Sequence, residues 1–485
     1  MMDIQIPDIS LSAIAPEITL TLTAILLLML EVFAANKGRD HLGYLALGGI
    51  LLAALLTTRL VGDPVSTFAG SYVVDNFGTF FKLIMLLAVG MTVLMSMRYN
   101  EDNGVDSGEY YAMLLFVTVG GFFMASGADL MTLFLGLETL SVALYVLAGY
   151  TRTRLASNEA SLKYFILGAL SSGFLLYGMA LVYGGTGATK LAQIGTAIAH
   201  GQVSAPLVAA GMLLMLIALA FKVAAVPFHM WTPDVYQGAP LPVTAFMSAG
   251  PKAAAFAFFI RVFAEAFPAM QADWWQILWL LAVVTMTVGN VIALAQDNVK
   301  RMLAYSSIAH AGYLLVGVTV ASEAGVSAVL FYLLIYTFMN IGAFAVVSVV
   351  AGKGEKYTTF ADFAGLGFRR PLLAMTLAMM IFSLAGIPPL AGFIGKFYLF
   401  MSALEGGFVW LAVIGVLNSV VSVYYYLKLT VYMYLKEEGS AVEASTAPFS
   451  PAMAVALVIA VYGVLAIGVM PAGYLAFAKT AFLSF

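Results

Sequence analysis

Four ionisable side chains lie inside long apolar runs of this sequence. They are Lys222 in GMLLMLIALAFKVAAVPFHMW, Glu138 in MTLFLGLETLSVALYVL, Lys252 in TAFMSAGPKAAAFAFF and Lys396 in LAGIPPLAGFIGKFYLF. A charge at bilayer depth costs roughly 2.5–3.5 kcal/mol or more on insertion scales, so such a residue usually faces a partner or a water-filled path. Together the four residues indicate a route for protons or ions through a membrane.

The elements that must position these residues are transmembrane helices. The chain has 485 residues, of which 62% are hydrophobic and 10% are charged, whereas ordinary domains are about half apolar and a quarter charged. Apolar stretches of about 18 residues or more are typical of spanning helices. We therefore predict an all-α polytopic membrane protein with about fourteen spans, centred near residues 25, 52, 87, 118, 139, 172, 217, 253, 284, 311, 338, 387, 420 and 461.

The distribution of Lys and Arg over the loops predicts the orientation, because cytoplasmic loops carry the excess. One set of alternate loops holds Lys37, Arg39, Arg98, Arg152, Arg154, Lys300, Arg301, Lys353, Lys356, Arg369, Arg370 and Lys436, and the other holds only Arg59, Lys190, Arg261 and Lys479. We therefore expect the first loop to be cytoplasmic and both termini periplasmic, in a bacterial inner (plasma) membrane. The N-terminus is acidic, so we also expect the first span to be retained.

Two spans contain helix-breaking residues in their interiors. The segment AVPFHMWTPDVYQGAP follows Lys222 in span 7, and LAGIPPLAGFIGKF surrounds Lys396 in span 12. Spans five apart cross the membrane in opposite directions, and paired broken helices in inverted halves point to a transport site. We expect a single transmembrane domain over 1–485, with a first repeat at 110–266 (spans 4–8), an inverted second repeat at 273–435 (spans 9–13), and flanking helices at 1–109 and 450–485.

Several function classes are excluded by what the sequence lacks. The chain contains no cysteine, which rules out disulfides, Cys-ligated zinc and iron–sulfur clusters within it. Its four histidines are scattered without metal-ligand spacing, and no nucleotide-binding fingerprint is present. We therefore expect neither a metal nor a cofactor in this chain and no nucleic-acid partner. The energy for transport must come from an ion gradient or from a partner protein.

Depth along the helices separates central residues from peripheral ones. At 1.5 Å rise per residue, Glu138, His310 and Lys252 lie roughly 14, 15 and 18 Å into their spans, near the midplane. Lys82 and Lys428 lie within a turn or two of a membrane face, where a lysine is expected to snorkel. The consecutive Tyr424, Tyr425 and Tyr426 point in different directions, so we interpret them as packing or interface anchors.

The segments KVAAVPFHMWTPDVYQGAP, ETLSVALYVLAGY, AGPKAAAF and SLAGIPPLAGFIGKFYLF together resemble the antiporter-like subunits of proton-translocating NADH:quinone oxidoreductase, respiratory complex I. The resemblance covers about residues 15–470, and these subunits are related to those of multisubunit Na⁺/H⁺ antiporters. Within the family the subunit N branch is favoured. Lys396 stands where subunit M typically has glutamate, no long lateral helix follows the last span, and ADFAGLGFRRP is similar to that branch.

The resemblance implies roles for the four buried groups. Glu138 and Lys222 would form the charge pair of the first half-channel, Lys252 would hold the central proton, and Lys396 would belong to the exit half-channel. Burial disfavours the charged form of a lysine and a nearby carboxylate favours it. We therefore expect Lys222 to pass its proton to Lys252 when Glu138 moves away, and Lys396 to release it outward.

Two further residues and all redox groups are also assigned by resemblance. His310 would bridge the central and exit sites, and Lys163 would tune the Glu138–Lys222 pair. FMN, iron–sulfur clusters and quinone would belong to partner subunits, so this chain would contribute to an oxidoreductase without a redox centre of its own. Its partners would be neighbouring antiporter-like and small membrane-arm subunits, together with the lipid bilayer.

Two alternatives remain open at this point. A subunit of a multisubunit Na⁺/H⁺ antiporter would share the same lysines and glutamate but would need no NADH. A structural membrane-arm subunit would transmit conformational change without moving protons, and only mutation of the lysines separates it from a pump.

Overall fold

The structure, a computed structural model, describes residues 9–33, 40–62, 64–105, 107–437 and 450–482. Among these residues, thirteen helices are long and apolar enough to cross a membrane. Their bounds are α1 (Ala15–Phe33), α2 (Asp40–Thr58), α3 (Asn76–Asn103), α4 (Gly108–Ser126), α5 (Leu130–Ala148), α6 (Leu155–Thr186), α8 (Ala205–Val223), α10 (Leu241–Glu265), α11 (Gln271–Leu294), α12 (Val299–Val320), α13 (Glu323–Ala351), α17 (Val409–Leu435) and α19 (Pro451–Val469).

The fourteenth expected span, near residue 387, is present as two short helices. α15 (Pro371–Ala385) and α16 (Ala391–Glu405) have 15 residues each, so neither reaches the length of a full span. Thirteen long helices and this broken one together confirm the all-α membrane fold and the count of about fourteen.

Both predicted helix breaks are present. α8 stops at Val223, and the short helix α9 (Trp231–Gly238) follows after seven non-helical residues, 224–230. The indole N–H of Trp231 donates to Phe221 O at 3.0 Å, and the same carbonyl accepts from the N–H of Ala224 at 3.1 Å, so α9 is tied to the last turn of α8. In the second break, Gly386 with φ 87° ends α15, a conformation that glycine adopts without a steric penalty. Lys222 precedes its break and Lys396 follows its own, as predicted.

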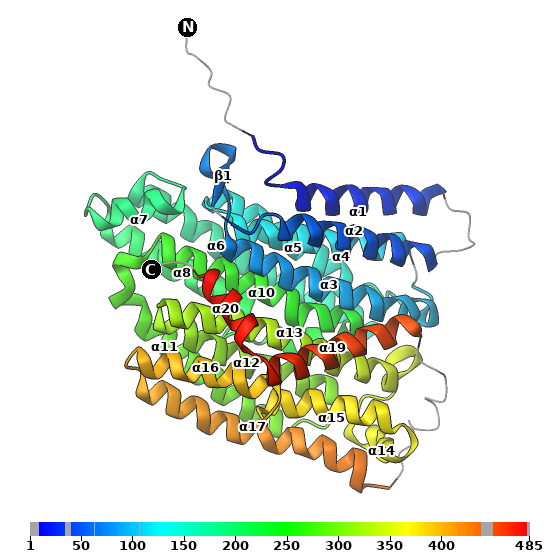
Figure 1. The fold of residues 1–485 in the computed structure, drawn as a ribbon. Coiled ribbons are helices and arrows are strands. Elements are labelled where there is room, and N and C mark those ends of the chain that lie inside the picture. The colour runs from blue at the N-terminus through cyan, green and yellow to red at the C-terminus, as the bar shows by residue number, and fades with distance from the viewer. Residues whose placement is uncertain (1–8, 34–39, 63, 106, 438–449, 483–485) are drawn as a thin grey trace.

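Three helices form the centre of the bundle. The most apolar windows of α10 and α12 are completely buried and that of α13 is 83% buried, whereas those of α2, α6 and α17 are only 39% buried. α10 and α12 have a lower mean hydropathy, 1.4, than the peripheral α2, α6 and α17, at 1.6, 1.9 and 1.6, because polar residues such as Lys252 and His310 face the interior of the bundle instead of lipid. Figure 1 shows the resulting layout, with α1 and α2 at one end, α17 at the other, and α10, α12 and α13 between them.

The connections carry short elements and no separate domain among the described residues. They comprise an antiparallel hairpin, in which Val65 pairs with Val74, and several short helices. Their bounds are β1 (Val65–Thr67), η1 (Phe68–Gly70), β2 (Tyr72–Val74), α7 (Leu191–Ala199), η2 (Pro268–Met270), η3 (Lys353–Glu355), η4 (Phe360–Phe363), α14 (Leu366–Arg369) and α20 (Ala472–Thr480).

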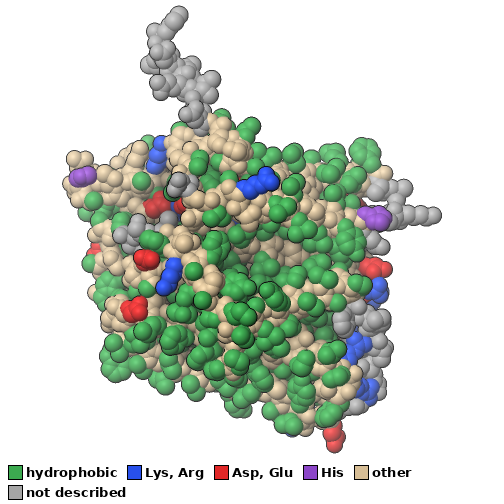
Figure 2. Space-filling view, in the orientation of Figure 1, with side chains coloured by type: hydrophobic (Ala, Val, Ile, Leu, Met, Phe, Trp, Pro, Cys, Tyr) green, Lys and Arg blue, Asp and Glu red, His purple; other side chains and the backbone are tan. Residues whose placement is uncertain are grey.

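Charged side chains are visible toward both edges of the molecule in Figure 2. Figure 2 shows hydrophobic side chains over most of the visible surface and several basic side chains along its right edge, the side where α14 lies in Figure 1. α1 begins and α19 ends on the opposite side. Two residues of the basic set, Lys37 and Arg39, lie outside the described residues.

The expectation that Lys82 snorkels is wrong. Its side chain is fully buried, and its Nζ lies 2.8 Å from Glu17 Oε1 and donates to Tyr72 Oη at 2.8 Å. The same Tyr72 hydroxyl donates to Glu17. Because Glu17 lies in α1 and Lys82 in α3, the ion pair joins two flanking helices. Lys428, in contrast, is 24% exposed and reaches Gln296 O at 3.3 Å near the end of α11.

Candidate functional site

Lys222 lies in the last turn of α8, directly before the first break. Its Nζ donates to Ser141 Oγ at 2.7 Å, and it lies 5.9 and 5.7 Å from the ring centres of Tyr145 and Tyr164. A cation beside aromatic faces gains electrostatic stabilisation where water is excluded. The ammonium is thus held by one hydroxyl and two rings in a site that is 8% exposed.

Glu138 lies on α5, three residues before Ser141, and accepts a hydrogen bond from Ser172 Oγ at 2.5 Å. Lys222 contacts Ser141 instead of the carboxylate, so the two charges act on each other through space without a direct ion pair. Residues three apart lie on the same face of a helix. A modest movement would therefore transfer the ammonium from Ser141 to Glu138.

Lys222 and Lys252 border the same enclosed cavity, which we call the lysine cavity. The centre of a water-sized sphere can occupy about 10 Å³ of it, which is the space of about one water molecule. Its lining also includes Tyr164, Trp231 and Tyr236. The structure therefore brings the first two lysines of the sequence prediction to a common space.

Lys252 lies on α10 and is 3% exposed. Its Nζ donates to both oxygens of Ser307 on α12, at 2.6 Å to the carbonyl and 2.5 Å to the hydroxyl, and lies 5.7 Å from the Tyr336 ring centre. The described structure places no carboxylate on this ammonium. A lysine held by neutral acceptors can exist with or without its proton, which a proton carrier requires.

His310 is completely buried between two tyrosine hydroxyls. Its Nδ1 lies 2.6 Å from Tyr332 Oη, and its Nε2 lies 3.2 Å from Tyr426 Oη, which in turn lies 2.5 Å from Ser306 Oγ. Each of these groups can both donate and accept a hydrogen bond. The cluster, which comes from α12, α13 and α17, can therefore pass a proton along its length.

The three consecutive tyrosines do point in different directions, and they include both an exposed residue and packed ones, as interpreted from the sequence. Tyr424 is 66% exposed, as an interface anchor would be, but Tyr425 and Tyr426 are completely buried. Tyr425 donates to Asn290 Oδ1 at 2.9 Å, and Tyr426 joins the histidine cluster. Consecutive helical residues do face different directions, so two of the three face the interior of the bundle.

Lys396 lies in the second turn of α16, directly after the second break. Its Nζ donates to Ala385 O at 3.1 Å and to Ser419 Oγ at 2.8 Å, and it lies 4.9 Å from the Tyr313 ring centre. Ala385 is the last residue of α15, so the lysine satisfies one of its orphan carbonyls. The ring of Tyr313 also packs edge-on against the ring of His310, with 5.4 Å between the ring centres. This contact links the Lys396 site to the histidine cluster.

Lys163 is not part of this row. Its Nζ pairs with Glu159 at 2.7 Å and Asp234 at 2.8 Å, and its side chain is 41% exposed. Asp234 also pairs with Arg301 at 2.8 Å. Lys163 therefore holds α9 from outside, and its contacts do not include Glu138 or Lys222.

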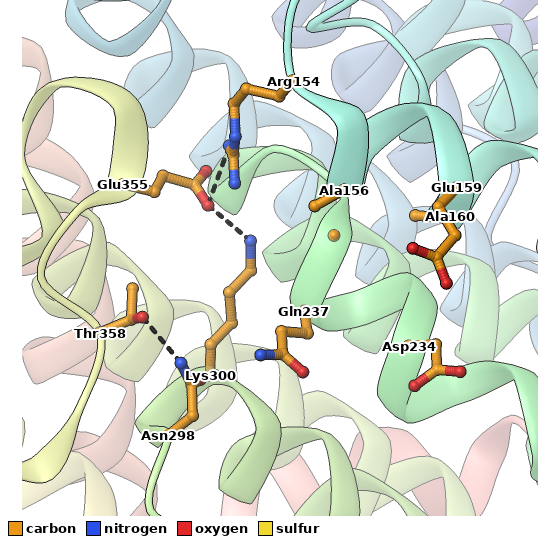
Figure 3. A pocket seen from close by; sticks show the side chains of 11 residues that line it. Arg154, Ala156, Glu159, Ala160, Asp234, Gln237, Asn298, Lys300, Glu355 and Thr358 are labelled. Carbon is orange, nitrogen blue, oxygen red and sulfur yellow. Dashed lines mark hydrogen bonds and ion pairs between the residues drawn. The ribbon is translucent and has the colours of Figure 1, made fainter.

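A second cavity, which we call the polar pocket, lies on the outer side of α9. It has a volume of about 380 Å³ and is lined by Arg154, Ala156, Glu159, Ala160, Asp234, Gln237, Gly238, Asn298, Lys300, Glu355 and Thr358. Figure 3 shows Arg154 and Lys300 pointing toward the Glu355 carboxylate. Arg154 and Lys300 belong to the loop charges that predicted the orientation, and Glu355 lies in the charged run KGEK, a pattern typical of a solvated loop.

The row from Glu138 to Lys396 contains lysines, a histidine and hydroxyls from serine and tyrosine. Such groups hold and transfer protons. Within the described parts of the chain, no three His, Asp or Glu side chains lie together so as to hold a metal ion. The fold and the row together define a polytopic membrane protein with a buried row of groups that can hold and transfer protons.

Comparison with known proteins identifies the family. Residues 127–422 match the family described as "NADH:quinone oxidoreductase/Mrp antiporter, TM". The matched segment is more than half of the chain and includes Glu138, Lys222, Lys252, His310 and Lys396. The chain therefore belongs to the family of membrane subunits found in NADH:quinone oxidoreductases and Mrp antiporters, and the sequence resemblance is confirmed.

Relatives and solved structures agree with this family. The chain is 54% identical to NADH-quinone oxidoreductase subunit N of Trichlorobacter lovleyi, over 99% of both chains. It is similar to a chain of respiratory complex I from Thermus thermophilus, with 36% identity, a TM-score of 0.80, and coverage of 96% of this chain and 99% of that one. A chain of the Mrp complex from Dietzia sp. has the same fold, with a TM-score of 0.83, 24% identity, and coverage of 98% and 97%.

Proposed function

We propose that this chain is the subunit N type of membrane-arm subunit of an NADH:quinone oxidoreductase and that it translocates protons. The observation that carries the proposal is the buried row from Glu138 to Lys396, in which two lysines border one cavity and a histidine cluster adjoins the third. The 54% identity to a subunit N over nearly the whole chain supports the choice of enzyme.

The geometry suggests an order of transfer. Lys222 delivers a proton through the lysine cavity to Lys252, since both border it and it has room for about one water molecule. Lys252 adjoins the α12 and α13 residues around His310, and the histidine cluster passes the proton toward Tyr313 and Lys396. Movement of Glu138 relative to Lys222 sets when the first lysine holds its proton.

The setting of the chain is part of the same proposal. FMN, the iron–sulfur clusters and quinone belong to partner subunits, and neighbouring membrane-arm subunits cover the sides of the bundle. The chain lies in a bacterial inner membrane with both termini periplasmic, supported by the excess of basic residues on the opposite face. Spans 4–8 (110–266) and 9–13 (273–435) act as inverted repeats, supported by the helix break in each.

Substitution of Lys222 or Lys252 by alanine tests the pump. In the assembled enzyme, reconstituted in vesicles, each change should abolish most proton translocation and slow quinone-dependent NADH oxidation, because the two processes are coupled. The matched control is Lys428→Ala, which removes a partly exposed lysine outside the row. Full proton stoichiometry in both lysine variants would refute the proposal and would favour a structural subunit that moves no protons.

An antiporter subunit is the second candidate, because the matching family includes Mrp antiporters. Gentle solubilisation of a tagged chain separates the two. Copurification of flavin, iron–sulfur clusters and quinone-dependent NADH oxidation supports the oxidoreductase. A flavin-free set of small membrane proteins with cation/proton exchange activity would instead establish the antiporter.

A further inference from the structure

The short helix α9 separates two cavities. Trp231 and Tyr236 on one side of α9 line the lysine cavity, whereas Asp234 and Gln237 on the other side line the polar pocket. The polar pocket is partly open to the surface, and the lysine cavity is enclosed. α9 is therefore the wall between a surface pocket and the space that Lys222 and Lys252 share.

The wall is fastened on its outer side by charged residues of other helices. Arg301 Nη1 donates to Asp234 Oδ1 at 2.8 Å and to Gln237 Oε1 at 3.0 Å. Lys300 Nζ donates to Ala239 O at 2.5 Å, directly after α9 ends. Since α9 is only eight residues long, these contacts have a large share in fixing its place.

Glu355 holds the turn between α9 and α10. Its Oε1 accepts from the N–H of Leu241, the first residue of α10, at 2.7 Å, and from Tyr99 of α3 at 2.6 Å. Its Oε2 accepts from Lys300 of α12 at 2.8 Å and lies 3.1 Å from Arg154, which precedes α6. One carboxylate thus connects α3, the start of α6, the turn between α9 and α10, and α12. These elements belong to a flanking helix and to both proposed repeats.

Glu355 is buried, and two cations keep its carboxylate charged. The Glu355 side chain is 1% exposed, and the residue has φ 52°, a left-handed conformation that a non-glycine residue keeps only when its surroundings enforce it. Burial by itself would raise the pKa of Glu355, but Lys300 and Arg154 outweigh it and hold that pKa below its usual value. The carboxylate is therefore charged at neutral pH and attracts both cations.

We propose that Glu355 is a positioning residue for the proton path, which pins the α9–α10 turn and so keeps the lysine cavity closed to the polar pocket. The inference rests on the proposed function, because a closed wall matters to a pump that must not leak. Loss of the carboxylate charge frees Lys300 and Arg154, loosens the turn and lets water and protons pass α9.

The absence of cysteine from the sequence gives a direct test of access. Ala255 lines the lysine cavity and is buried, so Ala255→Cys places a single thiol of this chain in that space. Membrane vesicles with the cytoplasmic face outward are treated with a water-soluble cationic methanethiosulfonate, and modification of this chain is followed by mass. We expect slow labelling with Glu355 present and labelling about tenfold or more faster with Glu355→Gln, a change equivalent to 1.4 kcal/mol.

Two further variants separate positioning from general damage. Glu355→Asp keeps the charge and should restore slow labelling at least in part. Glu101→Gln is the matched control, because Glu101 lies near Tyr99 at the end of α3 and is a 58% exposed carboxylate that pairs with Arg98 at the surface. In the assembled Glu355→Gln enzyme, NADH oxidation should continue, but the number of protons translocated per electron should fall. This combination is expected when protons leak back through the chain.

Equal labelling rates with and without the Glu355→Gln change would overturn the inference, and so would equal acceleration by the Glu101 control. If Glu355→Gln prevents assembly, Tyr99→Phe removes one hydrogen bond to the carboxylate without changing charge and should give a smaller acceleration; unchanged labelling there would count against the inference. The failure of the proposed function is a different result, namely full pumping by the Lys222 and Lys252 variants.

Discussion

Removal of Lys82 should destabilise the chain more than removal of any exposed lysine. The side chains of Lys82 and Glu17 are 0% and 4% exposed, with 2.8 Å between Nζ and Oε1. Lys82→Met leaves the Glu17 carboxylate buried without its cation, which costs about 3–5 kcal/mol. That loss corresponds to a change in the folded-to-unfolded ratio of roughly a hundredfold to several thousandfold.

The double variant Glu17→Gln with Lys82→Met isolates the cause. Replacement of both charges removes the uncompensated carboxylate, and neutral replacement of a buried pair is often close to neutral in stability. The Oε2 atom of Glu17 is also buried without a hydrogen-bond partner within the described structure, so the native pair is not fully satisfied. We therefore expect the double variant to regain at least about 2 kcal/mol of the loss.

The assay is the thermal inactivation midpoint of the purified complex, together with the amount of this chain in intact complex on native gels. Lys82→Met should lower both, the double variant should recover most of each, and Lys428→Met should change neither. Proton stoichiometry per electron should be unchanged in the double variant, because the pair lies outside the row from Glu138 to Lys396. A double variant as unstable as the single one would refute the reasoning.

Two other predictions concern hydroxyl and carboxyl groups. Tyr426→Phe removes the hydroxyl between Ser306 and His310, so the rate of proton translocation should fall several-fold while assembly stays normal. Tyr424→Phe, at an exposed site, should have no effect. Equal translocation rates in the two variants would exclude Tyr426 from the path. Because the pKa of Glu355 lies below its usual value, its stabilising charge is complete above about pH 4.3 and is lost only as pH falls through the lower folded value. Passive proton leak through reconstituted vesicles should therefore stay constant from pH 8 to about pH 5, and a rise between pH 7 and pH 6 would contradict this assignment.

The sequence was sufficient for the parts of the fold that follow from hydrophobicity and helix-breaking residues. All fourteen predicted centres fall within helices or, near residue 387, within a broken one. Lys222, Lys252 and Lys396 are buried as their apolar surroundings indicated. These features depend only on nearby sequence, because a lysine within about twenty apolar residues lies at bilayer depth and is stable there only inside the bundle.

Contacts between distant segments could not be predicted in this way. Glu17 and Lys82 are 65 positions apart and each lies near a helix end, where a charge ordinarily reaches water. Glu355 lies in a charged loop, and only the fold brings Tyr99, Lys300 and Arg154 around it. A charge near a membrane face is therefore ambiguous in sequence, because its partner determines whether it snorkels or is buried.

The two lysines beside the helix breaks have different partners, and this difference bears on the direction of transfer. Lys222 donates to Ser141, a hydroxyl on a neighbouring helix three residues from Glu138, so a small shift of α5 changes its electrostatic surroundings. Lys396 donates to the carbonyl of Ala385 within its own broken span, and a carbonyl neither titrates nor leaves without unfolding the helix end. We therefore expect Lys222 to be the residue that responds to movement of a carboxylate, and Lys396 to exchange its proton through Ser419 or by way of water beside Tyr313. Ser419→Ala should then slow proton release without altering the response at Lys222.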